Sequence, residues 1–255
     1  MKLRIIGRGY VGTFLGEALG VQPEPSSAAG TVSGDDVVIN CAGMTGRPNI
    51  DACEDAPGEA YEANVKLPAL LVERAGYLVH LSTGCFFDGP SPSADGWTET
   101  DEPNLLTSVY CRTKRLAELA LRRDNALCLR IRMPLNDVPH PRNLITKVRG
   151  YKRVIDAQNS VTYLPDLAAV VRRLLPLRLT GVLHVATPDT ISPHDLNTTA
   201  EPVRTLQGIT RAARSNCRLS VAKLERILGE PMSALRPRLA GILNNYETTL
   251  LCAAS

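Results

Sequence analysis

The chain has 255 residues, of which 44% are hydrophobic and 22% charged, and its formal net charge is +3. This composition is typical of globular proteins and argues against disorder or a fibre. The small charge excess argues against nucleic-acid binding, and no apolar run approaches the ~20 residues that cross a bilayer. The seven cysteines are scattered without a C-x-x-C pair. We therefore expect reduced thiols in a cytoplasmic protein, without a metal site or disulfides.

Short apolar runs alternate with helical patterns along most of the chain. The first predicted strand covers residues 2–6, and a helix follows the glycine turn at 7–12. Further strands are predicted at 35–43, 77–83, 126–134 and 181–187, and helices at 60–75, 108–123, 144–151 and 166–175. Residues 21–34 contain no convincing strand. The alternation predicts an α/β protein with a Rossmann-type, doubly wound parallel sheet.

The pattern of elements loosens after Pro134. We predict that residues 1–135 and about 151–190 form the Rossmann domain, and that about 136–150 and 191–255 form a small C-terminal substrate-binding cap. Within the tail we expect a break at 236–238, where Pro237 stands between two arginines. Such a cap lies over the carboxyl ends of the strands, where ligands bind in open α/β sheets.

A glycine motif follows the first strand. Gly7, Gly9 and Gly12 match G-x-G-x-x-G, which permits a tight turn, close approach to a pyrophosphate and close packing of helix on strand. The helix N-terminus offers unpaired N–H groups to phosphates. We expect NADPH or NADH as the cofactor. The predicted cofactor residues are Gly7, Arg8, Gly9, Tyr10, Val11, Gly12, Cys41, Ala42, Gly43, Asn64, Tyr110 and Lys114.

An acidic residue normally holds the ribose 2′-hydroxyl about 20 positions after the glycines. Here it is missing from a clear strand end, and Glu24, between two prolines, is the nearest candidate. Its absence removes repulsion against a 2′-phosphate, and Arg8 is placed to attract one. This favours NADPH, with NADH as the alternative.

Tyr110 and Lys114 have the spacing Y-x-x-x-K, which puts both side chains on one face of a helix. An ammonium beside a phenol lowers the pKa of the phenol from about 10, so the tyrosine becomes a competent acid for a carbonyl oxygen that receives a hydride. Ser82 and Thr83 end the preceding strand, where a hydroxyl can bind the same oxygen. A plain surface pair is the alternative for Tyr110 and Lys114.

Together with the glycine loop, Thr83, Tyr110 and Lys114 resemble the catalytic triad of the extended short-chain dehydrogenase/reductases. Further segments resemble the nucleotide-rhamnose synthase/epimerase-reductases, namely CAGMTGRPNIDACE, LSTGCFFDG, VYCRTK, RIRMP and PRNLITK. RSNCRLSVAKL resembles a tail motif shared with dTDP-4-dehydrorhamnose reductases. The resemblance covers residues 3–228. It implies a bifunctional 3,5-epimerase/4-reductase that converts UDP- or dTDP-linked 4-keto-6-deoxy-D-glucose to the L-rhamnose sugar nucleotide with NAD(P)H.

The resemblance also implies residues for epimerisation. The protons on C3 and C5 of a 4-keto sugar are acidic because the carbanion delocalises into the ketone. In the related enzymes a cysteine at the position of Cys85 is the base, and Lys147 matches the acid partner. His140 is a competing candidate for the acid. The alternatives are that Cys85 is a small buried hydrophobic residue and that Lys147 is a solvated helix charge.

The implied substrate carries a nucleoside diphosphate, and arginine suits phosphate geometry. Arg47, Arg142 and Arg214 are candidates for pyrophosphate or sugar contacts, with surface solubility as the alternative. The remaining substrate candidates are Met44, Thr45, Thr83, Cys85 and Asn143. For Met44 the alternative is core packing.

Other interpretations of the whole chain stay open. One is a monofunctional 4-reductase served by a separate epimerase, and another is a GDP-fucose-pathway epimerase-reductase, which PRNLITK disfavours. A third is a non-catalytic NAD(P)-binding regulatory subunit, against which the intact Tyr110, Lys114 and Thr83 argue. We expect a nucleotide sugar as the partner molecule, a homodimer as is common in the family, and neither nucleic acid nor membrane as a partner.

Overall fold

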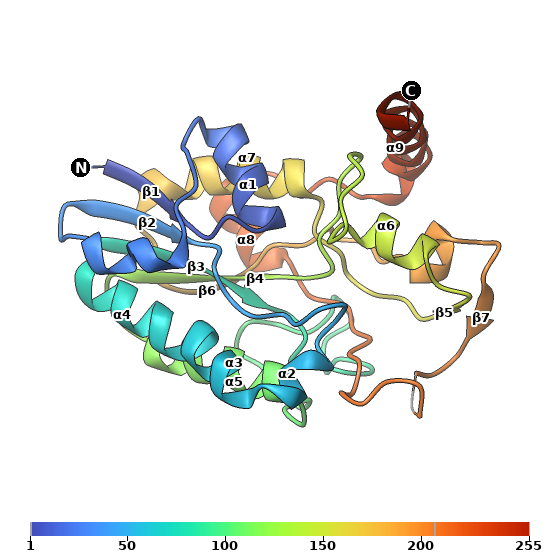
Figure 1. Ribbon diagram of the computed structural model, residues 1–255, viewed down its shortest axis with the longest axis horizontal. Helices are drawn as coiled ribbons and strands as arrows, with labels where there is room; N and C mark the ends of the chain where they lie inside the picture. The colour runs from blue at the N-terminus through green and yellow to red at the C-terminus, as the bar shows by residue number, and fades with distance from the viewer. Residues whose placement is uncertain (1, 207, 255) are drawn as a thin grey trace.

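One parallel sheet forms the centre of the computed structural model, which describes residues 2–206 and 208–254 (Figure 1). Neighbouring strands are parallel and lie in the order β1–β2–β3–β4–β6. The strands are β1 (Lys2–Ile6), β2 (Asp36–Asn40), β3 (Tyr77–Thr83), β4 (Ala126–Ile131) and β6 (Gly181–His184). β2 and β3 are buried along their whole length, which explains their continuous apolar sequences.

Helices cover both faces of this sheet, as Figure 1 shows. On one face α1 (Tyr10–Leu19) packs beside α7 (Leu164–Leu174), and α8 (Ala222–Leu228) joins the same core through the buried Leu224. On the other face α4 (Leu67–Arg74) and α5 (Val109–Ala120) pack against β3. The predicted Rossmann-type sheet with helices on both faces is therefore confirmed.

The expected helix at 60–75 is made of several pieces. α2 (Ala52–Asp55) and α3 (Pro57–Tyr61) precede a single π-helical turn, η2 (Glu62–Lys66), which leads into α4. A π turn is a usual cause of a change in helix direction. The π turn lies just before Pro68, which occupies the first turn of α4.

Residues 21–34 replace a strand by a single bridge. The backbone of Glu24 donates to Ile5 O at 2.8 Å and accepts from Gly7 N at 2.7 Å, on the edge of β1 opposite to β2. A short 3-10 helix, η1 (Ser26–Thr31), follows. The chain thus adds the Glu24 bridge on one side of β1 and then β2 on the other side. This reversal is a topological switch point, and it lies beside the glycine loop. Open α/β sheets bind their ligands at such points.

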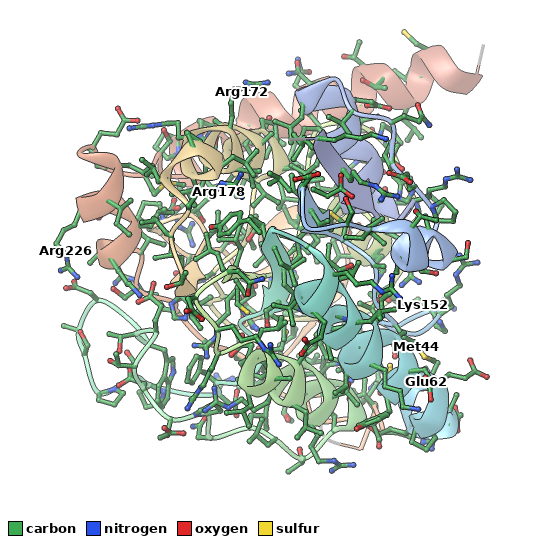
Figure 2. The ribbon with its side chains drawn as sticks, turned by 90° about the vertical axis from the view of Figure 1, so that its left-hand side faces the viewer. Met44, Glu62, Lys152, Arg172, Arg178 and Arg226 are labelled. Carbon is green, nitrogen blue, oxygen red and sulfur yellow. The ribbon has the colours of Figure 1, made fainter. Side chains whose placement is uncertain are left out.

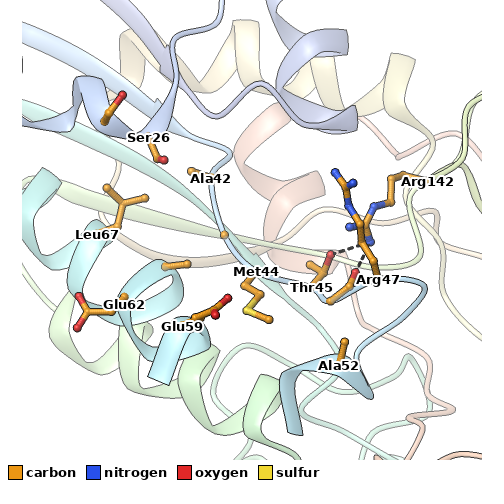
Figure 3. A pocket seen from close by; sticks show the side chains of 14 residues that line it. Ser26, Ala42, Met44, Thr45, Arg47, Ala52, Glu59, Glu62, Leu67 and Arg142 are labelled. Atoms are coloured by element: carbon orange, nitrogen blue, oxygen red, sulfur yellow. Dashed lines mark hydrogen bonds between the residues drawn. The ribbon is translucent and has the colours of Figure 1, made fainter. Parts of the chain in front are cut away.

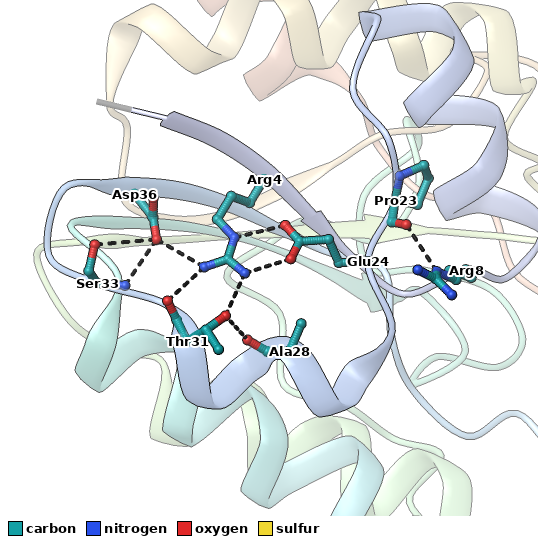
Figure 4. A network of polar contacts seen from close by, with 8 residues as sticks. All are labelled: Arg4, Arg8, Pro23, Glu24, Ala28, Thr31, Ser33 and Asp36. Carbon is teal, nitrogen blue, oxygen red and sulfur yellow. Dashed lines mark hydrogen bonds and ion pairs between the residues drawn. The ribbon is translucent and has the colours of Figure 1, made fainter.

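A buried guanidinium fixes this bridge. Arg4 donates through Nε and Nη2 to the carboxylate of Glu24 at 2.8 and 2.6 Å, and through Nη1 to Asp36 at 3.1 Å and to Thr31 O at 2.9 Å (Figure 4). The hydrogen bond from Arg4 holds the pKa of Glu24 below its ordinary value. The Glu24 carboxylate is thus committed to Arg4, so it is not available to a ribose hydroxyl.

A further hydrophobic cluster, which includes Ile145, Val154 and Tyr246, lies among the elements of the predicted C-terminal cap. The elements of the cap are α6 (Leu144–Arg149), β5 (Arg153–Ile155), η4 (Pro193–Leu196), β7 (Glu201–Val203) and α9 (Arg236–Ala254), grouped on one side of the molecule in Figure 1. α9 begins at Arg236, where the sequence suggested a break.

Two segments, β5 and α8, pack with a different part of the molecule from the one to which the sequence assigned them. β5 was assigned to the sheet domain, but it pairs with β7 of the cap. α8 was assigned to the cap, but it packs on β6 of the central sheet. A remaining 3-10 turn, η3 (Leu175–Leu177), follows α7. None of the helices within residues 2–206 and 208–254 is long and apolar enough to span a membrane.

Candidate active site

A cavity of about 350 Å³ lies at the carboxyl ends of the strands, between the glycine loop, α5 and α6. All five predicted catalytic residues line it, namely Thr83, Cys85, Tyr110, Lys114 and Lys147. The predicted cofactor or substrate residues that line it are Gly9, Tyr10, Val11, Cys41, Ala42, Gly43, Thr45 and Arg142. The fold therefore brings together the glycine loop, the Y-x-x-x-K pair, TGC and PRNLITK, which are far apart in sequence.

The triad residues come from two adjoining elements. Thr83 is the last residue of β3, and Tyr110 lies in the first turn of α5, which begins where Ser108 accepts a hydrogen bond from Cys111 N at 3.1 Å. The Thr83 side chain lies close enough to the Tyr110 phenol to act on its pKa. One turn further, Lys114 donates through Nζ to Leu81 O at 2.9 Å. The hydroxyls of Thr83 and Tyr110 thus share one wall of the cavity.

The expected lowering of the Tyr110 pKa is absent from the structure. Burial raises the pKa of the phenol, and Thr83 only partly opposes that effect. The ammonium of Lys114 donates to a backbone carbonyl, and burial lowers the pKa of Lys114 to about 8. At neutral pH Tyr110 is therefore a protonated phenol, which is the form that donates a proton.

Cys85 lies two residues beyond the end of β3 and is partly exposed to the cavity. Its Sγ accepts a hydrogen bond from Nη1 of Arg132 at 3.4 Å. The sequence analysis did not single out Arg132, although RIRMP contains it. The available signal was the pair Arg130 and Arg132 at a strand end, two charges on one face of a strand that is otherwise apolar.

Lys147 faces the cavity from the cap. Burial lowers its pKa, and the positive charges of Arg142 and Arg214 lower it further. His140, the competing acid candidate, is not among the residues that line the cavity. Its ring stacks on Tyr10 with 4.6 Å between centroids, and its Nδ1 accepts from the Arg142 backbone.

A larger hollow of about 940 Å³ adjoins the first cavity and shares Ala42, Gly43, Thr45 and Arg142 with it. Figure 3 shows Glu59 and Glu62 on its helical side and Arg47 and Arg142 on the opposite side, with Met44 and Thr45 between them. Arg142 donates to Thr45 Oγ1 at 3.2 Å and to Gly46 O at 2.6 Å. Met44 and Glu62 lie near one another in the turned view of Figure 2 as well. Met44 and Arg47 line this hollow only.

Six predicted site residues line neither hollow, namely Gly7, Arg8, Gly12, Asn64, Asn143 and Arg214. The last three have structural partners. Asn143 is fully buried, donates to Asn136 O and Val138 O at 2.8 Å each, and caps α6 by accepting from Ile145 N. Arg214 forms an ion pair with Asp51 at 2.9 Å. Asn64 exchanges hydrogen bonds with the Met44 backbone at 2.8 and 3.0 Å and donates to Thr113 at 3.1 Å, so it braces the loop after β2.

The glycine loop has the shape that a dinucleotide needs. Gly7 has φ +116°, and a Cβ on it would lie 2.4 Å from Ala42 N. A Cβ on Gly12 would lie 2.0 Å from Gly7 O, whereas a Cβ on Gly9 would meet nothing within 4 Å. No side chain caps α1, so its first N–H groups face the open space at Gly9. This cradle fits a pyrophosphate.

The Arg8 side chain is exposed, and its Nε donates to Pro23 O at 3.1 Å, beside the Glu24 bridge (Figure 4). Because Glu24 is held by Arg4, no carboxylate of the bridge opposes an anion near Arg8. These residues are compatible with a cofactor that carries a 2′-phosphate.

A parallel sheet with a glycine loop at its switch point and a Thr–Tyr–Lys group in the adjoining cavity define a Rossmann-type protein of the short-chain dehydrogenase/reductase class. The chain belongs to the RmlD substrate binding domain family, whose model matches residues 23–248.

The chain is similar to a bifunctional dTDP-4-dehydrorhamnose 3,5-epimerase/dTDP-4-dehydrorhamnose reductase of Arabidopsis thaliana, at 34% identity over 77% of this chain and 72% of the relative. It is also 34% identical to a trifunctional UDP-glucose 4,6-dehydratase/UDP-4-keto-6-deoxy-D-glucose 3,5-epimerase/UDP-4-keto-L-rhamnose-reductase of the same plant, but spans only 33% of that protein's length. Among solved structures, the UDP-rhamnose synthase of Acanthamoeba polyphaga mimivirus superimposes with a TM-score of 0.77 at 27% identity, covering 96% of this chain and 98% of the other.

Proposed function

We propose that the chain is an NAD(P)H-dependent 3,5-epimerase/4-reductase acting on UDP- or dTDP-linked 4-keto-6-deoxy-D-glucose. The observation that carries the proposal is the shared cavity, which places Cys85 and Lys147 with the reductase residues Thr83, Tyr110 and Lys114. A reductase alone needs only the second group. The relatives named for both activities support the same proposal.

For reduction, Thr83 and Tyr110 hold the C4 carbonyl oxygen of the sugar. NADPH, when bound along the glycine loop, supplies the hydride that the carbonyl carbon accepts. The phenol of Tyr110 then gives its proton to the oxygen, because burial keeps that phenol protonated until it is needed. The positive charge of Lys114 nearby favours the phenolate that remains.

For epimerisation, Cys85 takes the proton from C3 or C5. The C–H bond breaks, an S–H bond forms, and the electron pair moves to the C4 oxygen as an enolate. Lys147 then donates a proton to the opposite face of the carbon. Its lowered pKa makes this ammonium a stronger acid than a solvated lysine. Solvent then takes up the proton from sulfur and supplies one to Lys147, which restores both groups.

Positive charge at the junction of the two hollows suits the diphosphate of the substrate. Arg142 and Thr45 line both hollows, and Arg47 and Met44 continue the wall of the larger one. We assign Arg142 and Arg47 to the phosphates, because a guanidinium forms paired hydrogen bonds with phosphate oxygens. We assign Asn143 and Arg214 indirect roles, since Asn143 shapes the start of α6 and Arg214 contributes charge near Lys147.

The cofactor we propose is NADPH in preference to NADH, because Arg4 neutralises Glu24 and Arg8 stands beside it. The two-part domain division, a homodimer and a cytoplasmic location stay predictions of the sequence.

The test is an assay of the purified protein in D₂O with each 4-keto nucleotide sugar and NADPH. We expect NADPH consumption, deuterium at C3 and C5, and an L-rhamnose product. Cys85→Ala should lose the exchange but still reduce an already epimerised substrate, and Cys252→Ala, which removes an exposed thiol outside the cavity lining, should retain both. No NADPH consumption with either sugar would refute the proposal, and retained exchange in Cys85→Ala would remove Cys85 from it.

A further inference from the structure

Arg132 occupies a fixed position immediately after β4. Its backbone N–H donates to Thr162 Oγ1 at 2.9 Å, and its carbonyl accepts from Thr162 N at 2.7 Å. The side chain is 1% exposed. The guanidinium therefore has little freedom to change its partners, and its contact with Cys85 is a feature of the packed interior.

The partners of this guanidinium are all uncharged in their ordinary forms. Nη1 donates to Cys85 Sγ at 3.4 Å and to Ser215 Oγ at 2.8 Å. Nη2 donates to Ser215 O at 2.6 Å and to Asn159 Oδ1. Nε is buried without a hydrogen-bond partner. Among the described residues, no carboxylate pairs with Arg132.

Arg130, two residues earlier, shows the usual arrangement. It is equally buried, and its Nε and Nη2 donate to the carboxylate of Glu118 at 2.9 and 2.8 Å. A guanidinium stays protonated in proteins, and a buried charge without a counter-ion is costly. Arg130 thus has a carboxylate counter-ion, whereas the negative charge that would neutralise Arg132 has still to be identified.

Cys85 is the group that can supply this anion. It touches Arg132 directly, and it is partly exposed to the cavity, so its proton can leave to solvent. Two carboxylates whose charges act on the neighbouring thiols have backbone partners of their own, since Asp88 accepts from Asn216 N at 2.8 Å and Glu54 from Val109 N at 2.7 Å.

The other titratable groups around Cys85 do not compete for that role. Burial raises the pKa of Cys111 to about 12 and also raises the pKa of Tyr110 and Cys217, so all three stay neutral at physiological pH. The other titratable groups that line the cavity are Tyr10 and Cys41, whose pKa values are raised by burial, and the cations Lys114, Lys147 and Arg142.

We propose that Arg132 is a positioning residue that stabilises the thiolate of Cys85 and directs its sulfur into the cavity. Hydrogen bonds to Ser215 and Asn159 hold the guanidinium in place, so its Nη1 faces Sγ whether or not substrate is present. The use of that thiolate as a base in epimerisation rests on the proposed function, whereas the Arg132–Cys85 interaction does not.

The first test measures alkylation of the unliganded protein by iodoacetamide across pH, with each cysteine followed by mass spectrometry. The exposed Cys252 on α9 is the internal control. In the wild-type protein the midpoint of the Cys85 profile should lie below that of Cys252, and a midpoint at or above it would overturn the proposal without any variant.

Two variants of Arg132 then distinguish the effect of its charge on Cys85 from the effect of its packing. Arg132→Gln keeps an amide donor but removes the charge, and should shift the Cys85 profile to higher pH and slow its alkylation at neutral pH about tenfold. Arg132→Lys keeps the charge and should recover most of the rate. A purely structural role predicts equal profiles in both variants and wild type, and that result would refute the inference.

Deuterium exchange into the sugar separates this inference from the proposed function. If the wild-type protein exchanges at C3 and C5 and Arg132→Gln exchanges equally fast, the inference fails while the function stands. If the wild type does not exchange, the function fails, and the alkylation profiles still decide the role of Arg132. We expect slower exchange in Arg132→Gln, rescued by Arg132→Lys.

Discussion

Alanine substitutions at Gly9 and Gly12 should affect different properties, namely cofactor affinity at Gly9 and stability at Gly12. A Cβ on Gly9 meets no atom within 4 Å, and the residue has φ −83° and ψ 179°, which alanine adopts without strain. Alanine is a poorer helix N-cap than glycine, but it also restricts the unfolded chain. These effects nearly cancel, so Gly9→Ala should change the free energy of unfolding by less than about 0.5 kcal/mol.

Gly12→Ala is the matched contrast, because its Cβ would lie 2.0 Å from the carbonyl oxygen of Gly7, against the 3.4 Å at which ordinary contact begins. That oxygen belongs to the turn, so relief requires α1 to move away from β1. We expect Gly12→Ala to lower the free energy of unfolding by about 2 kcal/mol, in the range of overpacked sites.

The new methyl group of Gly9→Ala occupies the cradle at the start of α1. We therefore expect its Kd for NADPH to rise at least about tenfold, or about 1.4 kcal/mol. Urea unfolding gives the stability, and fluorescence titration with NADPH gives the affinity. Unchanged NADPH affinity in Gly9→Ala would refute the assignment of the pyrophosphate to this loop. A loss of stability as large as that of Gly12→Ala would refute the packing argument.

Three further outcomes follow from buried polar groups. Glu118→Gln should lower the free energy of unfolding in urea by about 3 kcal/mol, since it leaves Arg130 buried without its counter-ion; a loss under about 1 kcal/mol would contradict this. Asn143→Ala should cost about 2 kcal/mol by leaving buried carbonyls unpaired, and a thermal transition equal to wild type would show that these hydrogen bonds are dispensable. The kcat/KM for 4-reduction should fall as pH rises through about 8, because Lys114 then loses its positive charge, and a profile that stays flat well above that pH would exclude this role.

The local sequence was sufficient to predict those strands and turns whose conformation depends on their own residues. The strand predicted at 2–6 ends at Ile6 in the structure, and that at 77–83 runs from Tyr77 to Thr83, because buried parallel strands are continuous apolar runs. The glycine loop was also recognised from its motif. The contact of Gly12 with Gly7 O is local, whereas the crowding at Gly7 comes from Ala42, which follows β2. The convergence of the motifs on one cavity followed from the rule that strand ends meet at one edge of a sheet.

Non-local partners account for what the sequence did not reveal. The three-residue strands β5 and β7 are defined by each other across about fifty residues, so neither has a signal of its own. Asn143 resembles a site residue in sequence, yet it is a fully buried helix cap. Arg132 resembles any strand arginine until the absence of a carboxylate near it, among the residues described, becomes visible in three dimensions.

Reduction and epimerisation make opposite demands on one cavity. In the proposed reactions, reduction needs a phenol that keeps its proton, that of Tyr110. Epimerisation needs a thiol that has lost its proton, that of Cys85, two residues after the end of β3. The two groups line the same cavity but come from different elements. Tyr110 is buried on α5, where desolvation disfavours the charged form. Cys85 lies on the partly exposed loop after β3, where its Sγ accepts a hydrogen bond from the guanidinium of Arg132. The position of each group, more than its residue type, therefore decides which proton it can move.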